Sequence, residues 1–114
     1  MKEIKLGDLE ETLLLLVGIL DQDAYALRIS EEYENQTKKG ISIGAVHGTL
    51  NRLIEKGFLT SEMGEATAER GGRRKRIYSI TAAGDAALQE SRDFKMSLWK
   101  QYPTLSTGNL NFEF

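Results

Sequence analysis

The residues best suited to chemistry in this chain are basic and lie close together. Residues 66–80 carry five cations and one acid, a net charge of +4, whereas the whole chain of 114 residues has a net charge of −2. The remainder therefore sums to −6, and an acidic body of this kind would be repelled by a polyanion except along a basic edge. The cluster predicts phosphate contact, with a solvated hairpin tip as the alternative. Its cations are Arg70, Arg73, Arg74, Lys75 and Arg76.

A short helix is predicted directly before this basic segment. Ser42 is a good N-cap, and Lys56-Gly57 is typical of a helix end. At about 100° per residue, one narrow arc of this helix is apolar, which fixes its buried side and hence its exposed side. The arc holds Val46, Leu50 and Leu53, while the opposite stripe holds Gly44, Gly48, Asn51 and Glu55, flanked by His47 and Arg52.

The two glycines on the exposed stripe of this helix require a reason. Glycine inside a helix costs about 1 kcal/mol relative to alanine. Close approach to another surface would explain both Gly44 and Gly48. The alternative is that they are tolerated because packing holds the helix.

The N-terminal part of the chain predicts a helix from Asp8 to about Leu20, with Asp8 as its N-cap. Glu10 and Glu11 in the first turn favour this start, because they meet the positive end of the helix dipole. The leucine run that follows is apolar on every side, so a three-helix core cannot cover all of it. We expect a partner chain to cover Leu13, Leu14, Leu16 and Val17.

A second helix, ending near Gln36, follows the polar break at residues 21–23. Tyr25, Ile29 and Tyr33 recur every fourth residue and are expected to face the core. The polar stretch 35–40 closes on a glycine and predicts a turn.

Beyond the short helix, residues 58–65 and 76–81 predict two strands around a glycine-containing turn. Thr81 then caps a final helix from Ala82 to about Tyr102. A compact domain of this size does not need this amphipathic helix for its own core, so it predicts a dimerisation arm. The expected interface residues on it are Leu88, Phe94, Leu98, Trp99 and Tyr102.

These elements predict a mainly α fold with a small β-hairpin (α+β), namely a winged helix-turn-helix with a C-terminal dimerisation helix. The expected division is a DNA-binding domain over residues 1–81, a dimerisation helix over 82–103 and a tail over 104–114. The tail alternates polar and apolar residues at its end, so it is either mobile or docked through Leu110, Phe112 and Phe114.

Composition excludes several classes of protein. The chain has no cysteine and one histidine, so no metal and no cofactor is expected. The leucine run is shorter than the roughly 20 residues that cross a bilayer, and acidic residues flank it, which predicts a cytoplasmic protein with no membrane partner. The sequence shows no nucleophile beside a base, no carboxylate pair flanked by binding aromatics and no phosphate loop, so it predicts that the protein is not an enzyme.

With its elements placed in this order, the chain resembles the PadR family of transcriptional regulators over roughly residues 6–98. The resemblance rests on the shared order and spacing of several short motifs. These are Gly7 before the leucine-rich helix, Tyr25 with Ile29, Ile43-Gly44-Ala45-Val46, Leu50-Asn51-Arg52-Leu53, Lys56-Gly57-Phe58-Leu59, Gly71-Gly72-Arg73-Arg74-Lys75 and Tyr78-Ser79-Ile80-Thr81-Ala82-Ala83-Gly84.

The chain departs from the family pattern at two positions. His47 stands where the family usually has a tyrosine, and Ala26 where it usually has a glycine. An imidazole is shorter than a phenol but can still donate to a phosphate, and it can titrate near neutrality. The C-terminal part is short and resembles the subgroup with a single terminal helix.

The resulting hypothesis is a homodimeric, sequence-specific repressor that binds double-stranded DNA at an inverted-repeat operator. A protein-interaction module that never meets DNA is the alternative, because fold alone does not exclude it. The expected DNA-binding residues are Ser42, Gly44, His47, Gly48, Asn51, Arg52, Arg70, Arg73, Arg74, Lys75 and Arg76.

The family resemblance also implies that some members release DNA on binding a small molecule. Trp99, with Phe94 and Tyr102, is the candidate effector pocket for a flat aromatic or cationic compound. The alternative is that these rings only fill the dimer interface.

Overall fold

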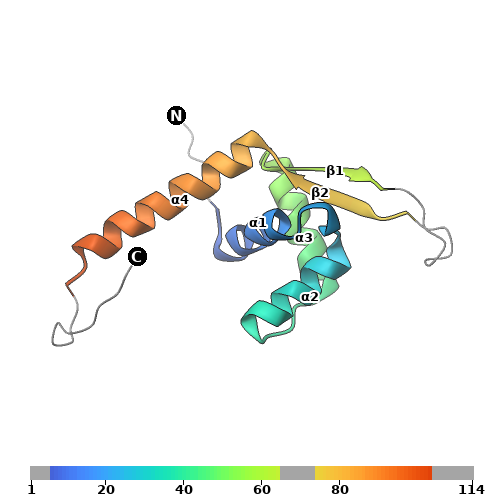
Figure 1. Cartoon of the computed structure of the whole chain (residues 1–114), viewed down its shortest axis with the longest axis horizontal. Coiled ribbons are helices and arrows are strands. Elements are labelled where there is room, and N and C mark those ends of the chain that lie inside the picture. The colour runs from blue at the N-terminus through green and yellow to red at the C-terminus, as the bar shows by residue number, and fades with distance from the viewer. Residues whose placement is uncertain (1–5, 65–73, 104–114) are drawn as a thin grey trace.

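The computed structural model describes residues 6–64 and 74–103, and these form a three-helix body, a hairpin and a long final helix. In Figure 1 the hairpin and the final helix project from opposite sides of the body. The predicted α+β fold is confirmed. The elements are α1 (Asp8–Leu20), the 3₁₀ turn η1 (Asp21–Asp23), α2 (Ala26–Thr37), α3 (Ile43–Glu55), β1 (Leu59–Met63), β2 (Arg76–Ile80) and α4 (Ala82–Gln101).

The start of α1 differs from the sequence prediction by one residue. Gly7 is the N-cap, and Asp8 is the first helical residue. The side chain of Glu10 reaches back, and its Oε1 accepts a hydrogen bond from the Gly7 N–H at 2.8 Å. The carboxylate satisfies one of the donors that a helix start leaves open, so Asp8 is not needed as the cap.

The leucine run of α1 lies in the core of the protomer, which corrects the expectation that a partner chain must cover it. Leu13 and Leu14 are fully buried, and Leu16 and Val17 are nearly so. Helices α2 and α3, the hairpin and α4 all pack against α1, so the chain itself surrounds most of this helix. Only Leu15 and Ile19 present large apolar side chains of α1 to solvent.

The turn between α2 and α3 is made without the expected glycine. Lys38 adopts the left-handed conformation at φ 63° directly after α2, while Gly40 does not need that freedom. Ser42 then caps α3 as predicted, since its Oγ accepts a hydrogen bond from the Ala45 N–H at 3.0 Å. Local side-chain chemistry therefore sets where α3 begins.

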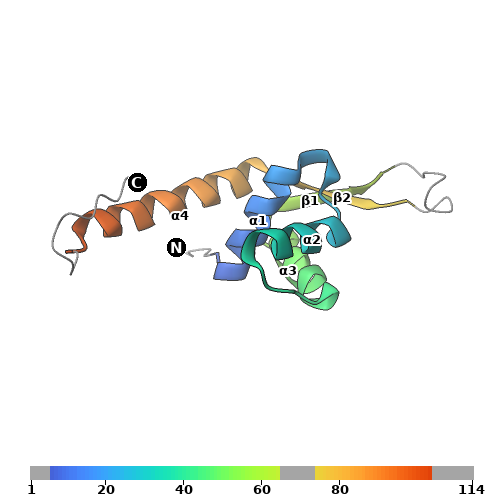
Figure 2. The ribbon, with the colours of Figure 1, turned by 60° about the horizontal axis from the view of Figure 1, so that its bottom comes forward.

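Both hairpin strands are shorter than predicted. Strand β1 begins one residue later and ends two residues earlier than the predicted range, and β2 ends one residue earlier. They pair antiparallel, with Leu59 opposite Ile80 and Met63 opposite Arg76. The N–H of Tyr78 donates to the carbonyl of Ala24 at 2.9 Å, which attaches β2 to the segment before α2. Figure 2 shows the strands above both α2 and α3. This attachment places the hairpin beside the body of the fold.

Helix α4 begins where the sequence predicts and is anchored by its first turn. The Oγ1 of Thr81 accepts from the Gly84 N–H at 3.0 Å and donates to the Gly57 carbonyl at 2.7 Å. A Cβ on Gly84 would collide with the carbonyl oxygen of Phe58, so the helix packs there without a side chain. Farther along, Lys95 Nζ pairs with Glu11 Oε1 of α1 at 2.7 Å.

Candidate nucleic-acid interface

The exposed face of α3 is the one that the sequence predicts. Val46, Leu50 and Leu53 are fully buried and orient the helix, with Thr49 beside them. Gly44, His47 and Asn51 are exposed, and Gly48 is half-buried. The structure thus presents the predicted stripe on the surface.

Neither glycine of this face is required by packing among the described residues. A Cβ added to Gly44 would meet no described atom within 4 Å, and one added to Gly48 would meet only Arg52 Nη1 at 3.9 Å. Both residues lie inside α3, and neither has a positive φ, so a helical backbone accommodates them without the conformational freedom of glycine. The cost of placing glycine in a helix is therefore not offset by any contact within the described protomer.

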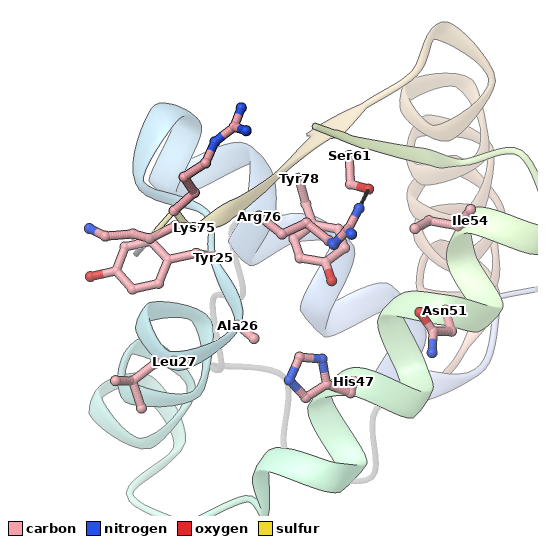
Figure 3. Close-up of a pocket in the computed structure, with 11 residues that line it drawn as sticks. Tyr25, Ala26, Leu27, His47, Asn51, Ile54, Ser61, Lys75, Arg76 and Tyr78 are labelled. Atoms are coloured by element: carbon pink, nitrogen blue, oxygen red, sulfur yellow. Dashed lines mark hydrogen bonds between the residues drawn. The ribbon is translucent and has the colours of Figure 1, made fainter. Parts of the chain in front are cut away.

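A cleft of about 670 Å³ lies between α3, the start of α2 and the part of the hairpin nearer its turn. In Figure 3 the side chain of His47 extends from α3 into the space between α2 and the hairpin, and Asn51 lies one turn farther along the same helix. The cleft thus joins one flank of α3 to the basic strand. Its lining residues are Tyr25, Ala26, Leu27, His47, Asn51, Ile54, Ser61, Arg74, Lys75, Arg76 and Tyr78.

The three described cations of the hairpin are held by separate local contacts. Arg76 Nη1 donates to Ser61 Oγ at 3.0 Å across the two strands (Figure 3), and Arg74 Nε donates to the Gly64 carbonyl at 2.9 Å. None of these three has a carboxylate within ion-pairing distance among the described residues. No carboxylate in the described part of the chain therefore neutralises their charge. Arg70 and Arg73 lie outside the described residues.

Lys75 makes a contact that the sequence does not predict. Its Nζ lies 4.1 Å from the centre of the Tyr25 ring, within the range of a cation–π interaction (Figure 3). Tyr25 is half-buried, is the N-cap residue of α2 and lines the cleft, which corrects the expectation that it faces the core as Ile29 and Tyr33 do. The pairing orients the ammonium group and links the hairpin to α2.

Arg52 lies on the other flank of α3, away from the cleft. Its Nε pairs with Glu10 Oε2 at 3.3 Å, and its Nη2 donates to Thr49 Oγ1 at 3.2 Å. The structure thus places Arg52 beside Glu10 and outside the cleft, and its contact with DNA stays a prediction. Its guanidinium holds α3 against α1, although its side chain stays 55% exposed.

Glu10 is at the centre of the contact between α1 and α3. The sequence marks this residue only as an acid in the first turn of a helix. It is 7% exposed and binds both Arg52 and Lys56. Burial raises the pKa of its carboxyl, but hydrogen bonds from Lys56 and Gly7 and the charges nearby outweigh burial and hold that pKa below its ordinary value of 4.5. The carboxylate is therefore ionised at neutral pH.

The predicted interface residues of α4 divide into two groups. Leu88 packs partly against the core of its own protomer. In contrast, Phe94, Leu98, Trp99 and Tyr102 are between 49% and 63% exposed. The rings of Trp99 and Tyr102 meet edge to face, with centroids 5.7 Å apart. The distal part of α4 thus carries an apolar, aromatic surface in the protomer.

Over residues 6–64 and 74–103, no helix is long and apolar enough to cross a bilayer. No group of three or more histidine or acidic side chains comes together there in a way that could hold a metal ion.

Three helices pack together, and the third of them exposes one face beside an antiparallel hairpin. This arrangement defines a winged helix-turn-helix protein. Residues 14–90 match the model of the transcriptional regulator PadR-like family, and the chain belongs to this family. It is also 34% identical over 86 residues to an uncharacterised protein of Lysinibacillus sphaericus, covering 74% of each chain.

Solved structures of similar proteins have the same fold. A PadR-like transcription factor from Bacteroides fragilis has a TM-score of 0.67 at 24% identity, covering 82% of this chain and 84% of that one. A PadR-like transcriptional regulator from Bacillus cereus has a TM-score of 0.62 at 17% identity, covering 78% and 84%. A PadR family regulator from Eggerthella lenta has a TM-score of 0.61 at 19% identity, covering 78% and 75%.

Proposed function

We propose that this transcriptional regulator binds double-stranded DNA as a homodimer and acts as a repressor. The observation that carries the proposal is the cleft in which His47 and Asn51 of α3 face Arg74, Lys75 and Arg76 of the hairpin. Phosphate contacts position a protein on DNA, and base contacts specify the site. The hairpin cations serve the first purpose and the exposed face of α3 serves the second.

Within α3, the N-terminal half is the part that enters the major groove. The charge along the helix supports this orientation, because Glu55 is exposed near its C-terminal end and would repel phosphate. Ser42 and the first amides of α3 lie at the positive end of the helix dipole, where a phosphate is favoured. The glycines support the same placement, since Gly44 and Gly48 let the helix backbone approach base edges closely.

The distal part of α4 is proposed as the dimerisation surface, with residues 1–81 as the DNA-binding domain. Phe94, Leu98, Trp99 and Tyr102 form an exposed apolar surface that is costly to leave in water. Leu15 and Ile19 of α1 are the other exposed apolar residues available for this contact. A symmetric dimer would read an inverted repeat whose half-sites lie about 34 Å apart.

An effector site is proposed on the same helix. Trp99 and Tyr102 already meet edge to face, so a flat aromatic or cationic compound could stack on them and shift the dimer geometry. Such a shift would change the spacing of the two α3 helices and release DNA. The proposal thus assigns Phe94, Trp99 and Tyr102 to both dimer contact and ligand binding.

Selection of bound duplexes from a random pool, followed by footprinting, tests the proposed function directly. We expect an enriched inverted repeat, protected symmetrically on both strands. Enrichment of sites without dyad symmetry would remove the dimer from the proposal. No enrichment even at low salt would remove DNA binding and favour a protein-interaction module instead.

A further inference from the structure

The large apolar side chains that remain exposed in the described chain fall in two places. Nine such side chains are exposed among the described residues. Six of them form the first place, on α1 and at the distal end of α4, where the dimer contact is proposed. The other three are Leu27, Ile43 and Met63. Leu27 lines the cleft, and Met63 pairs with Arg76 at the open end of the described strands. These three therefore belong to the proposed DNA-facing part of the molecule.

Ile43 is the one of the three that α3 itself carries. It is the first residue of the helix and is 47% exposed. His47 and Asn51, four and eight residues later, line the cleft, and Ile43 precedes His47 by one turn on the same side of α3. A single line of reading positions thus begins with a branched hydrocarbon and ends with an amide.

The chemistry of Ile43 restricts what it can contact in a DNA groove. Its side chain has no hydrogen-bonding group, so it gains nothing from a phosphate or from a base donor or acceptor. The apolar group on the floor of the major groove is the 5-methyl of thymine. Resting on the proposed DNA-binding function, we infer that Ile43 is a specificity residue that contacts a thymine methyl in each half-site.

The same line of residues fixes a second position in the half-site. Asn51 can donate to N7 and accept from the N6 amino group of an adenine, which is the pairing its amide geometry favours. If α3 lies along the direction of base stacking, its eight-residue rise of about 12 Å corresponds to about three to four base pairs, because stacked bases are about 3.4 Å apart. The half-site therefore contains a thymine and an adenine at that separation.

Replacement of thymine by deoxyuridine in a selected duplex tests the inference, because deoxyuridine lacks only the methyl group. Replacing one thymine in one half-site should lower wild-type affinity about fourfold, as one buried methyl implies. Ile43→Ala should bind the thymine and deoxyuridine duplexes equally, and Ile43→Val should retain part of the difference. Met63→Ala removes another exposed apolar side chain, and whatever its effect on overall affinity it should keep the wild-type ratio between the thymine and deoxyuridine duplexes.

Several results would overturn the inference. One is a selected half-site without thymine, and another is an equal loss at deoxyuridine for wild type and Ile43→Ala. A lower melting temperature for Ile43→Ala with unchanged sensitivity to deoxyuridine would show that Ile43 packs within the protein instead. If the wild-type chain selects no DNA, the proposed function fails too, whereas DNA binding without methyl discrimination removes Ile43 alone.

Discussion

The carboxylate of Glu10 accepts a hydrogen bond from Lys56 Nζ at 2.7 Å, which joins the first turn of α1 to the residue that ends α3. The second oxygen of the same carboxylate binds Arg52 at 3.3 Å. Helix α3 thus has two flanks with different roles. One is fixed to α1 by this acid, and the other borders the cleft.

Replacing Glu10 with glutamine should lower the free energy of unfolding at pH 7 by about 1–2 kcal/mol. Hydrogen bonds to a charged group contribute about 1.5–3 kcal/mol, and the loss should lie toward the lower end because Lys56 and Arg52 are exposed enough to be rehydrated. Urea unfolding of Glu10→Gln and wild type measures the difference. The control is Glu11→Gln, whose partner Lys95 is more exposed than Lys56, and it should change stability by less than about 1 kcal/mol.

The stabilisation by Glu10 should depend on pH in a defined direction. The pKa of its carboxyl is lower in the folded protein than the ordinary value of 4.5, so on acidification the unfolded chain takes up the proton first. The contribution is therefore present in full above about pH 4.5 and is lost as the pH falls through the lower, folded-state pKa. An equal stability gap between wild type and Glu10→Gln at pH 7 and pH 3 would contradict this assignment.

Gly44→Ala and Gly48→Ala should each stabilise the isolated protein by about 1 kcal/mol, because both positions have helical backbone and free space. The same changes should weaken operator binding at least about fivefold, since a methyl that holds α3 away from the bases loses contacts worth about 1–3 kcal/mol. Thermal unfolding and fluorescence anisotropy measure the two effects. Gly40→Ala is the control, because Gly40 lies outside the helix, and it should leave affinity unchanged. If Gly44→Ala and Gly48→Ala both bind the operator as tightly as wild type, α3 does not approach the bases closely.

The double variant Arg74→Ala with Arg76→Ala should reduce affinity for every duplex and lower the slope of log K against log salt. Two lost phosphate contacts correspond to a slope change of about 1.8 per protomer. Titrations at several salt concentrations on operator and unrelated DNA measure it. Arg92→Ala with Lys100→Ala removes the same charge from α4, on the opposite side of the body (Figure 1), and should leave the slope as it is.

Phe94→Asp with Leu98→Asp should convert the proposed dimer to a folded monomer. Both side chains are exposed in the protomer, so their replacement should not disturb the core. Light scattering measures the mass, and circular dichroism checks the helix content. Asp93→Asn on the same helix should remain dimeric. A dimeric double variant would place the interface elsewhere.

Binding of an aromatic cation such as benzamidine should quench the fluorescence of Trp99, which is the only tryptophan of the chain. If this site is the effector site, the compound should also release the operator from wild type at concentrations that quench. Trp99→Leu keeps an apolar side chain in the proposed dimer contact, so this variant should still bind the operator and should keep it bound in the presence of the compound. Release of DNA from both proteins alike would move the effector site away from Trp99.

The sequence by itself determined the elements and the orientation of α3. The caps at Ser42 and Thr81 join side chains to backbone three residues away, and the apolar arc of Val46, Leu50 and Leu53 repeats at helical spacing. Interactions of this kind are contained within one or two turns, so they are visible in the order of residues.

The tertiary structure alone decided which side chains share a site. Glu10 meets Arg52 and Lys56 from 42 and 46 residues away, and no local pattern marks that pairing. Lys75 likewise reaches Tyr25 only because β2 is attached beside the start of α2. Burial of the leucine run also depends on how α2, α3, the hairpin and α4 surround α1. A sequence shows that α1 is apolar all round, but only packing shows that the chain itself supplies most of the cover.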